Sequence, residues 1–198
     1  TGVQTCALPI SCGSNPSSSA ATLTINPLTK IVTQPASSTR CVGENVVMTI
    51  TASGSSLTYQ WRKNGTNISA TSPVFSINNL ILNDAASYTC LVTGSCGSIL
   101  SNPAVLTVNN PAAISTQPTS GTICQGASTS LSVVAVGTGL TYKWYKNTVA
   151  MSDEGHYSGT SSNTLIISNA DLTDGGSFTC LVSGTCNIVT SQPAVVTV

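Results

Sequence analysis

The chain has 198 residues with six basic and six acidic side chains, one histidine and a formal net charge of zero. A nucleic-acid partner is not expected, because phosphate contacts require a clustered basic surface that six scattered cations do not supply. An anionic membrane surface is excluded on the same grounds. No run approaches the roughly 18 consecutive apolar residues of a spanning helix, so membrane insertion is not expected either.

Eight cysteines occur in a chain that is rich in serine and threonine, which together fill 59 positions. Cysteine at this density predicts disulfide bonds and therefore an oxidising, extracellular location. The alternative is a set of buried free thiols that act as small hydrophobic side chains.

The first ten residues require a separate interpretation. Residues 1–10 back-translate into a nucleotide string that resembles a common sequencing-library adapter. We therefore expect this segment to be artefactual, with Cys6 placed in it by accident, and the chain to be a fragment of a longer reading frame.

Residues 11–26 are predicted to be the C-terminal remnant of a preceding repeat. Their Ser-Cys-Gly-Ser at residues 11–14 is repeated at residues 95–98, and their Leu-Thr-Ile-Asn at residues 23–26 is similar to Leu-Thr-Val-Asn at residues 106–109. Self-similarity of this kind is the signature of an array of repeats.

Two complete copies follow, which we call unit 1 (residues 27–109) and unit 2 (residues 110–198). Both contain Thr-Gln-Pro, Cys-x-Gly, Tyr-x-Trp and Asp-x-x-Ser-aromatic-Thr-Cys-Leu-Val in the same order. Trp61 and Trp144 are 83 residues apart, whereas Cys90 and Cys180 are 90 apart. Unit 2 therefore has seven additional residues between these two landmarks.

Apolar residues alternate with polar or small ones in short segments of both units. Val46, Met48 and Ile50 show this period of two, as do Leu131 and Val133. Segments of this kind, separated by Gly/Asn/Ser turns every 8–12 residues, predict an antiparallel β-sandwich. No segment keeps a helical period over three turns, so almost no helix is expected.

Each unit resembles an immunoglobulin-like domain. The resemblance is carried by Trp61 and Trp144 and by the segments at residues 84–90 and 174–180. It implies an all-β fold of tandem Greek-key sandwiches, arranged as beads on a string. More narrowly, the units resemble the I-set-like tandem repeats of large secreted bacterial surface and adhesin proteins.

The resemblance also implies a corner tied by the hydroxyl of Tyr88 and a tryptophan packed against an inter-sheet disulfide. The chain departs from this pattern twice, because Phe178 lacks the hydroxyl and the first cysteine of that disulfide is replaced by Ile50 and Val133. The predicted core is Trp61, Trp144, Tyr88, Phe178, Ile50, Val133, Cys90 and Cys180.

The cysteines of the two units are predicted to pair across the joint. Bridged Cα atoms must lie within about 7 Å, and the turn of Cys41 is expected at the end of its sandwich opposite to that of Cys96, a strand length of roughly 23 Å away. In a head-to-tail chain Cys41 would instead meet Cys186. Cys96 and Cys124 would then bond the preceding and the following unit.

The competing hypothesis is a bond inside each hairpin, Cys90 with Cys96 and Cys180 with Cys186. Three cysteines in each unit force either a free thiol or a bond between units, so the sequence leaves both patterns open.

The inserted stretch of unit 2 contains the only histidine. Asp153, Glu154, His156 and Tyr157 form a candidate contact loop, since carboxylate and imidazole donors lie close together in it. An exposed, solvated loop is the favoured interpretation, because no metal-ligand spacing is present. No catalytic residue and no cofactor are expected, because neither a nucleophile elbow nor a paired-carboxylate arrangement occurs.

These observations predict a structural spacer in an extracellular bacterial surface protein, with neighbouring repeats as its partners. Two alternatives remain open: an adhesion module that binds a surface glycan or protein, and an accessory region of a secreted hydrolase.

Overall fold

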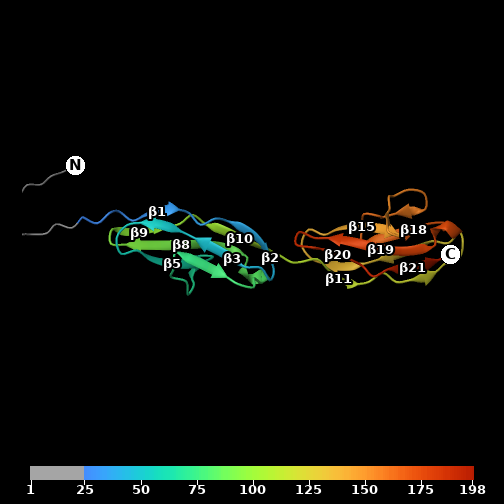
Figure 1. The fold of residues 1–198 in the computed structure, drawn as a ribbon, viewed down its shortest axis with the longest axis horizontal. Helices are drawn as coiled ribbons and strands as arrows, with labels where there is room; N and C mark the ends of the chain where they lie inside the picture. Colours follow the sequence, from blue (N-terminus) through green and yellow to red (C-terminus); the bar gives the residue numbers. More distant parts are fainter. Residues whose placement is uncertain (1–24) are drawn as a thin grey trace, which may run out of the picture.

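The structure, a computed structural model, describes residues 25–198. The predicted adapter segment at residues 1–10 and all but the last two residues of the predicted remnant at residues 11–26 lie outside the described residues. Two β-sandwiches follow one another end to end along the chain (Figure 1). The prediction of tandem immunoglobulin-like sandwiches is therefore confirmed.

Unit 1 contributes ten strands. They are β1 (Lys30–Thr33), β2 (Ser38–Cys41), β3 (Val46–Thr49), β4 (Thr51–Ser53), β5 (Thr58–Lys63), β6 (Thr66–Asn67), β7 (Val74–Ile77), β8 (Ala86–Gly94), β9 (Gly97–Leu100) and β10 (Ala104–Asn109). One sheet has the order β2-β10-β8-β5-β6, with β9 on β8, and the ladders β1-β4 and β3-β7 form the opposite layer. Only Ile50 separates β3 from β4.

Unit 2 repeats this arrangement with one addition. Its strands are β11 (Ala113–Thr116), β12 (Gly121–Thr122), β13 (Thr129–Ser132), β14 (Val134–Val136), β15 (Thr141–Lys146), β16 (Val149–Ala150), β17 (Tyr157–Ser158), β18 (Thr164–Ile167), β19 (Gly176–Ser183), β20 (Ile188–Thr190) and β21 (Ala194–Thr197). The larger sheet has the order β12-β21-β19-β15-β16, with β20 on β19, and β11 pairs with β14. The added strand is β17, which extends the ladder β13-β18.

The first strand of each sandwich changes sheets partway. In unit 1, β1 pairs antiparallel with β4, whereas β2 pairs parallel with β10, with Cys41 opposite Asn109. The end of β2 is thereby placed beside the end of β10, where the chain leaves unit 1.

Helix is restricted to two single turns in the described part of the chain, η1 (Leu82–Asp84) and η2 (Leu172–Asp174). Both lie at the corner that precedes the longest strand of their unit, β8 or β19. Within residues 25–198, none of the helices has the length and apolar character needed to cross a membrane.

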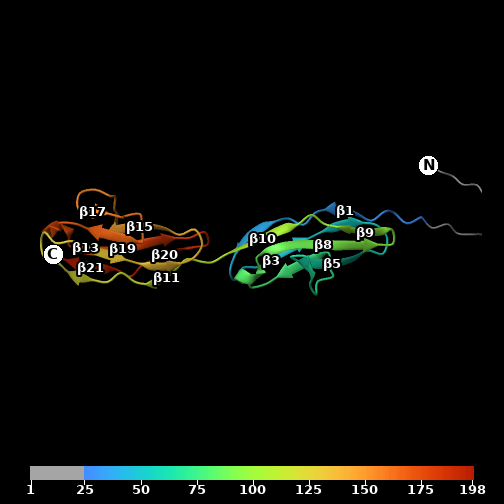
Figure 2. The same ribbon diagram turned by 180° about the vertical axis from the view of Figure 1, so that it is seen from behind.

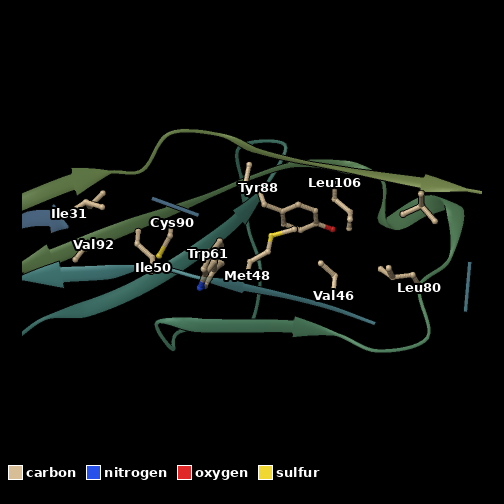
Figure 3. Packing of buried hydrophobic residues seen from close by; sticks show 12 residues of the cluster. Ile31, Val46, Met48, Ile50, Trp61, Leu80, Tyr88, Cys90, Val92 and Leu106 are labelled. Atoms are coloured by element: carbon tan, nitrogen blue, oxygen red, sulfur yellow. The ribbon is translucent and has the colours of Figure 1, made fainter. Parts of the chain in front are cut away.

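Each unit has a hydrophobic core of its own. Figure 3 shows side chains from both layers of unit 1 pointing into the space around Trp61. Trp144 occupies the matching place in a separate cluster in unit 2. Both rings are fully buried, and their indole N–H groups donate to the carbonyls of Ser72 (2.8 Å) and Ser162 (2.9 Å).

The alternation of the sequence has a direct structural cause. In β3, Val46 and Met48 are buried while Val47 and Thr49 are exposed, because successive side chains of a strand point to opposite faces. All eight residues predicted for the core are at most 1% exposed. Ile50 and Cys90 both belong to this buried cluster (Figure 3), in which the resemblance places an inter-sheet disulfide.

Candidate functional site

The joint between the two sandwiches is the site where sequence and structure point to a function. Strand β10 ends at Asn109 and β11 begins at Ala113, so only three residues separate them. Cys41, the last residue of β2, forms a disulfide with Cys186 in the turn between β19 and β20, with Cα atoms 5.9 Å apart. The bond connects positions 145 residues apart and crosses from unit 1 to unit 2.

A tight turn after β2 presents Cys41 to the neighbouring unit. The Glu44 carboxylate accepts the backbone N–H of Cys41 (2.7 Å), and the N–H of Val42 donates to the carbonyl of Asn109 (2.9 Å). Gly43 has a φ of 88° and donates to the carbonyl of Leu80 (2.8 Å). This left-handed conformation explains the glycine of the Cys-x-Gly motif, because a Cβ would be strained there.

Hydrogen bonds fix the linker to unit 2. The N–H of Asn110 donates to the Thr138 hydroxyl (2.9 Å), and the N–H of Thr138 donates to the Asn110 carbonyl (3.0 Å). The N–H of Ala112 donates to the amide oxygen of Asn187 (2.6 Å), whose Nδ2 donates back to the Ala112 carbonyl (3.0 Å). The joint is therefore held by a covalent bond, a three-residue connection and two reciprocal pairs of hydrogen bonds.

The predicted bond between Cys41 and Cys186 is confirmed, and the competing hypothesis of a disulfide inside each hairpin is wrong. Cys90 and Cys180 are free thiols inside the two cores, and Cys96 is a free thiol at the surface. Burial raises the pKa of Cys90 and raises that of Cys180 to about 11. Both groups therefore stay protonated near neutral pH and act as small apolar side chains, since only the thiolate is reactive.

Cys96 occupies the same place in unit 1 as Cys186 does in unit 2. Its sulfur lies 3.4 Å from the carbonyl oxygen of Asn26, and the sulfur of Cys186 lies 3.6 Å from that of Asn109. Cys124, the counterpart of Cys41, is exposed and free.

The additional residues of unit 2 enter at one point of the sandwich. In unit 1 the backbone of Trp61 bonds to Ile68 and Ala70, which flank a single residue, Ser69. In unit 2 the backbone of Trp144 bonds in the same way to Met151 (3.0 Å) and Thr160 (2.9 Å), which flank eight residues. We call residues 152–159 the insertion.

The insertion folds back onto its own unit. The Tyr157 hydroxyl donates to Oδ1 of Asp174 (2.6 Å) and accepts from Nζ of Lys146 (2.8 Å). Nδ1 of His156 lies 2.6 Å from Oδ2 of Asp174, a carboxylate that is 3% exposed. In unit 1 the corner hydroxyl of Tyr88 donates to the carbonyl of Asp84 (2.9 Å). The insertion thus brings a tyrosine hydroxyl to the corner at which Phe178 has none.

The hydrogen bonds around Asp174 shift the pKa values of the group. Burial by itself raises the pKa of Asp174, but the bonds from Tyr157, from the backbone of Asp171 and from His156 outweigh it and lower the pKa. The hydrogen bond to Asp174 raises the pKa of His156. Burial, together with the same carboxylate, raises the pKa of Tyr157.

The four predicted contact residues therefore differ in their environment. His156 and Tyr157 are half-buried, and Asp153 accepts the backbone N–H (2.8 Å) and the hydroxyl (2.6 Å) of Thr160. Glu154 is exposed and accepts the hydroxyl of Ser152 (3.0 Å). A contact role for the loop stays a prediction.

One three-residue group of potential metal donors occurs among residues 25–198. Donor atoms of His156, Asp171 and Asp174 lie within 4.8 Å of one another. Sequence reasoning missed this group, because the aspartates follow the histidine by 15 and 18 residues with no ligand spacing between them. The Asp174 carboxylate, which would have to bind the metal, already accepts hydrogen bonds from His156 and from the backbone N–H of Asp171 (2.8 Å). The arrangement is therefore that of a hydrogen-bonded clamp.

The fold and the joint define a chain of tandem immunoglobulin-type sandwiches. Comparison with protein families matches the immunoglobulin domain at residues 29–93 and again at residues 111–183. The chain belongs to the immunoglobulin domain family. Comparison with curated proteins gives no match.

Solved structures with the same fold contain several such domains in a row. An E-to-A variant of titin domains I67–I69 is 22% identical with a TM-score of 0.75, and the alignment covers 85% of this chain and 65% of that one. Rst D1-D2 is 19% identical with a TM-score of 0.69, covering 86% and 99%. Sidekick-1 immunoglobulin domains 1–4 are 20% identical with a TM-score of 0.57, covering 86% and 47%. At these identities the similarity concerns the fold alone.

Proposed function

We propose that the chain is a non-catalytic spacer, built of immunoglobulin-like repeats, in a large extracellular surface or adhesin protein of a bacterium. The observation that carries the proposal is the Cys41–Cys186 disulfide across the joint. A short linker limits bending between neighbouring domains, and a second covalent connection beside it restricts both bending and twisting. Restriction of this kind is what a spacer needs to keep a distal part of a protein away from a surface.

The extracellular setting is supported by the chemistry of the same bond. Disulfides persist in oxidising compartments and are reduced in the cytosol. The bacterial source is inferred only from the resemblance of the repeats to those of bacterial surface proteins.

The same connection is proposed for further joints. Cys96 would form a disulfide with a cysteine of a preceding unit. Its sulfur lies beside the carbonyl of Asn26, just as the sulfur of Cys186 lies beside the carbonyl of Asn109. Cys124 would form a disulfide with a cysteine of a following unit, as its counterpart Cys41 does with Cys186 here. A chain with a second copy of residues 109–198 fused after Val198 should bond Cys124 to the third cysteine of the added copy. A peptide map that finds Cys124 reduced in the oxidised fusion contradicts this.

The stiffness of the joint tests the spacer role. Residual dipolar couplings of the oxidised chain should fit one common alignment tensor for both units. In the double variant Cys41→Ser/Cys186→Ser the two units should require tensors of different magnitude. Cys96→Ser/Cys124→Ser, which leaves the joint intact, is the matched control. Separate tensors in the oxidised native chain would contradict a stiff joint.

A further inference from the structure

Strand β7 of unit 1 has an open edge. It pairs with β3 on one side, and no described strand of the chain lies along its other side. The counterpart in unit 2, β18, is covered on that side by β17, with Tyr157 opposite Ile167 and Ser158 opposite Ile166. Figure 2 shows β17 in the orange loop that stands out from unit 2.

The open edge leaves apolar side chains of unit 1 uncovered. Leu165 and Ile167 of β18 are fully buried, whereas the aligned Phe75 and Ile77 of β7 are only half-buried. Beside them is a hollow of about 340 Å³, and its apolar wall includes Ile68, Phe75, Ile77 and the ring of Tyr88. In unit 2, Tyr157 packs against the corresponding part of the core.

A lysine and an aspartate lie at one end of this hollow. Nζ of Lys63 is 3.6 Å from Oδ1 of Asp84, and both side chains are part of the lining. Their counterparts Lys146 and Asp174 are bridged by the hydroxyl of Tyr157, which accepts from the lysine and donates to the carboxylate. The two lysines are held alike, since Lys63 donates to the Asn83 carbonyl (2.6 Å) and Lys146 to that of Thr173 (2.5 Å).

Unit 1 therefore has the lysine, the aspartate and the apolar residues that match those around Tyr157, but it lacks the strand. Ile81 and Ala70 stand where unit 2 has Asp171 and Thr160. We infer that the open edge of β7 and the adjoining hollow bind an extended, tyrosine-containing segment of a partner protein. The segment pairs antiparallel with β7, and its tyrosine lies opposite Ile77 with the hydroxyl between Lys63 and Asp84. This inference does not depend on the spacer role.

The backbone groups of β7 and Asn78 that face the open edge favour a peptide as the ligand. Ser168 of unit 2 donates its backbone N–H to the carbonyl of His156 (2.8 Å), and Asn78 is the aligned residue of unit 1. Exposed strand edges bind extended peptides through such backbone bonds, while pockets beside the edge select the side chains. A hollow closed at one end by a donor and an acceptor selects a phenol over a purely apolar ring.

Titration of the full ¹⁵N-labelled chain with a synthetic peptide of residues 152–161 (SDEGHYSGTS) tests the inference. At about 1 mM peptide, comparable to the effective concentration that a short tether supplies, the amide signals of β7 and of Lys63 should shift while those of β18 stay unchanged. The same peptide with phenylalanine in place of tyrosine should bind about tenfold more weakly, because it lacks the hydrogen bonds to two charged groups.

Two variants of the protein locate the site. Ser76→Pro removes an N–H that the register directs toward the open edge, a position where proline is tolerated in an edge strand, and should abolish binding. Lys63→Met should weaken peptide binding about tenfold, with Lys30→Met as its matched control. If the proline variant fails to fold, the lysine variant tests the location of the site by itself.

Three results would overturn the inference. The first is the absence of shifts in β7 at this peptide concentration. The second is equal binding of the tyrosine and phenylalanine peptides. The third is self-association of the chain without peptide that protects β7, since the occupant would then be the insertion of a second copy.

Discussion

At the scale of single residues, the clamp around Asp174 sets unit 2 apart from unit 1. A buried carboxylate is unfavourable unless hydrogen bonds compensate for the lost water. Tyr157, His156 and the backbone of Asp171 supply these bonds in unit 2. In unit 1 the carboxylate of Asp84 is more exposed and depends less on such partners.

Replacing Tyr157 with phenylalanine is expected to lower the free energy of unfolding of unit 2 by about 1.5–3 kcal/mol, because a hydrogen bond to a buried charged group is lost. Denaturant unfolding followed by the fluorescence of the two tryptophans measures the change. Tyr145→Phe is the matched control, since its hydroxyl has no hydrogen-bond partner among the described residues. Equal effects of the two variants would contradict a role of the Tyr157 hydroxyl.

The stability of unit 2 is expected to decrease above about pH 6.5. The pKa of His156 is raised in the folded state, so its contribution is complete below the unfolded pKa and is lost as the pH rises through the folded one. The pKa of Asp174 is lowered, so its contribution is present above the unfolded pKa of about 3.9 and is lost as the pH falls through the folded one. Unit 2 should therefore be most stable between these two limits.

Native-state hydrogen exchange of β18 measures this pH dependence, with β7 of unit 1, which has no histidine, as the internal control. In His156→Gln the free energy of opening should no longer fall between about pH 6.5 and pH 8. The loss of stability at low pH, which comes from Asp174, should remain. A slope that persists in the variant would show that another group titrates.

At the scale of elements, the insertion covers the edge of β18 without being required for the connection after β16. Unit 1 closes the same connection with Ser69 alone, and both connections are anchored by backbone bonds to the tryptophan of their unit. The sandwich therefore does not need residues 152–159 to close. What they add is β17, which covers one edge of the sheet, and the side chain of Tyr157, which packs against the core.

Replacement of residues 152–159 by a single serine should leave unit 2 folded but less stable by about 3–5 kcal/mol, more than Tyr157→Phe alone. The hydrogen bonds to Asp174 are lost, and Leu165 and Ile167 lose part of their cover. Denaturant unfolding measures the loss, and Glu154→Gln, which changes an exposed side chain of the insertion, is the control. The shortened unit should also bind the tyrosine peptide. Complete unfolding of unit 2 would show that the insertion is part of the fold itself.

At the scale of the whole molecule, the disulfide determines how the chain responds to force. Tension applied to the two ends bypasses the segment between Cys41 and Cys186, because the bond carries the load. Most of both sandwiches is thereby shielded from extension, although each has a separate core.

Reduction should therefore increase the extended length of a single pulled molecule by about 500 Å, the reach of the 145-residue segment at roughly 3.5 Å per residue. Force spectroscopy in the presence and absence of a reductant measures this length. Cys96→Ser/Cys124→Ser should behave as the native chain does. Equal lengths in both conditions would mean that the bond is not formed in solution.

The sequence by itself determined the repeat, the sandwich and the placement of both tryptophans in a core, because burial with a period of two is a local property of each strand. Short sequence distances also suggested which cysteines lie at the ends of a unit. The choice between the joint and the hairpin for Cys186 required the tertiary structure, since both pairings satisfy the spacing.

Only the tertiary structure decided what the insertion does. His156 and Tyr157 meet Asp174 across 17 or 18 residues, and Lys146 joins them from a third element. The path of a loop that carries no periodic signal is set by such distant contacts, which the local pattern does not encode. The open edge of β7 also required the tertiary structure, because the absence of a covering strand is recognised only by comparison with β17 on β18.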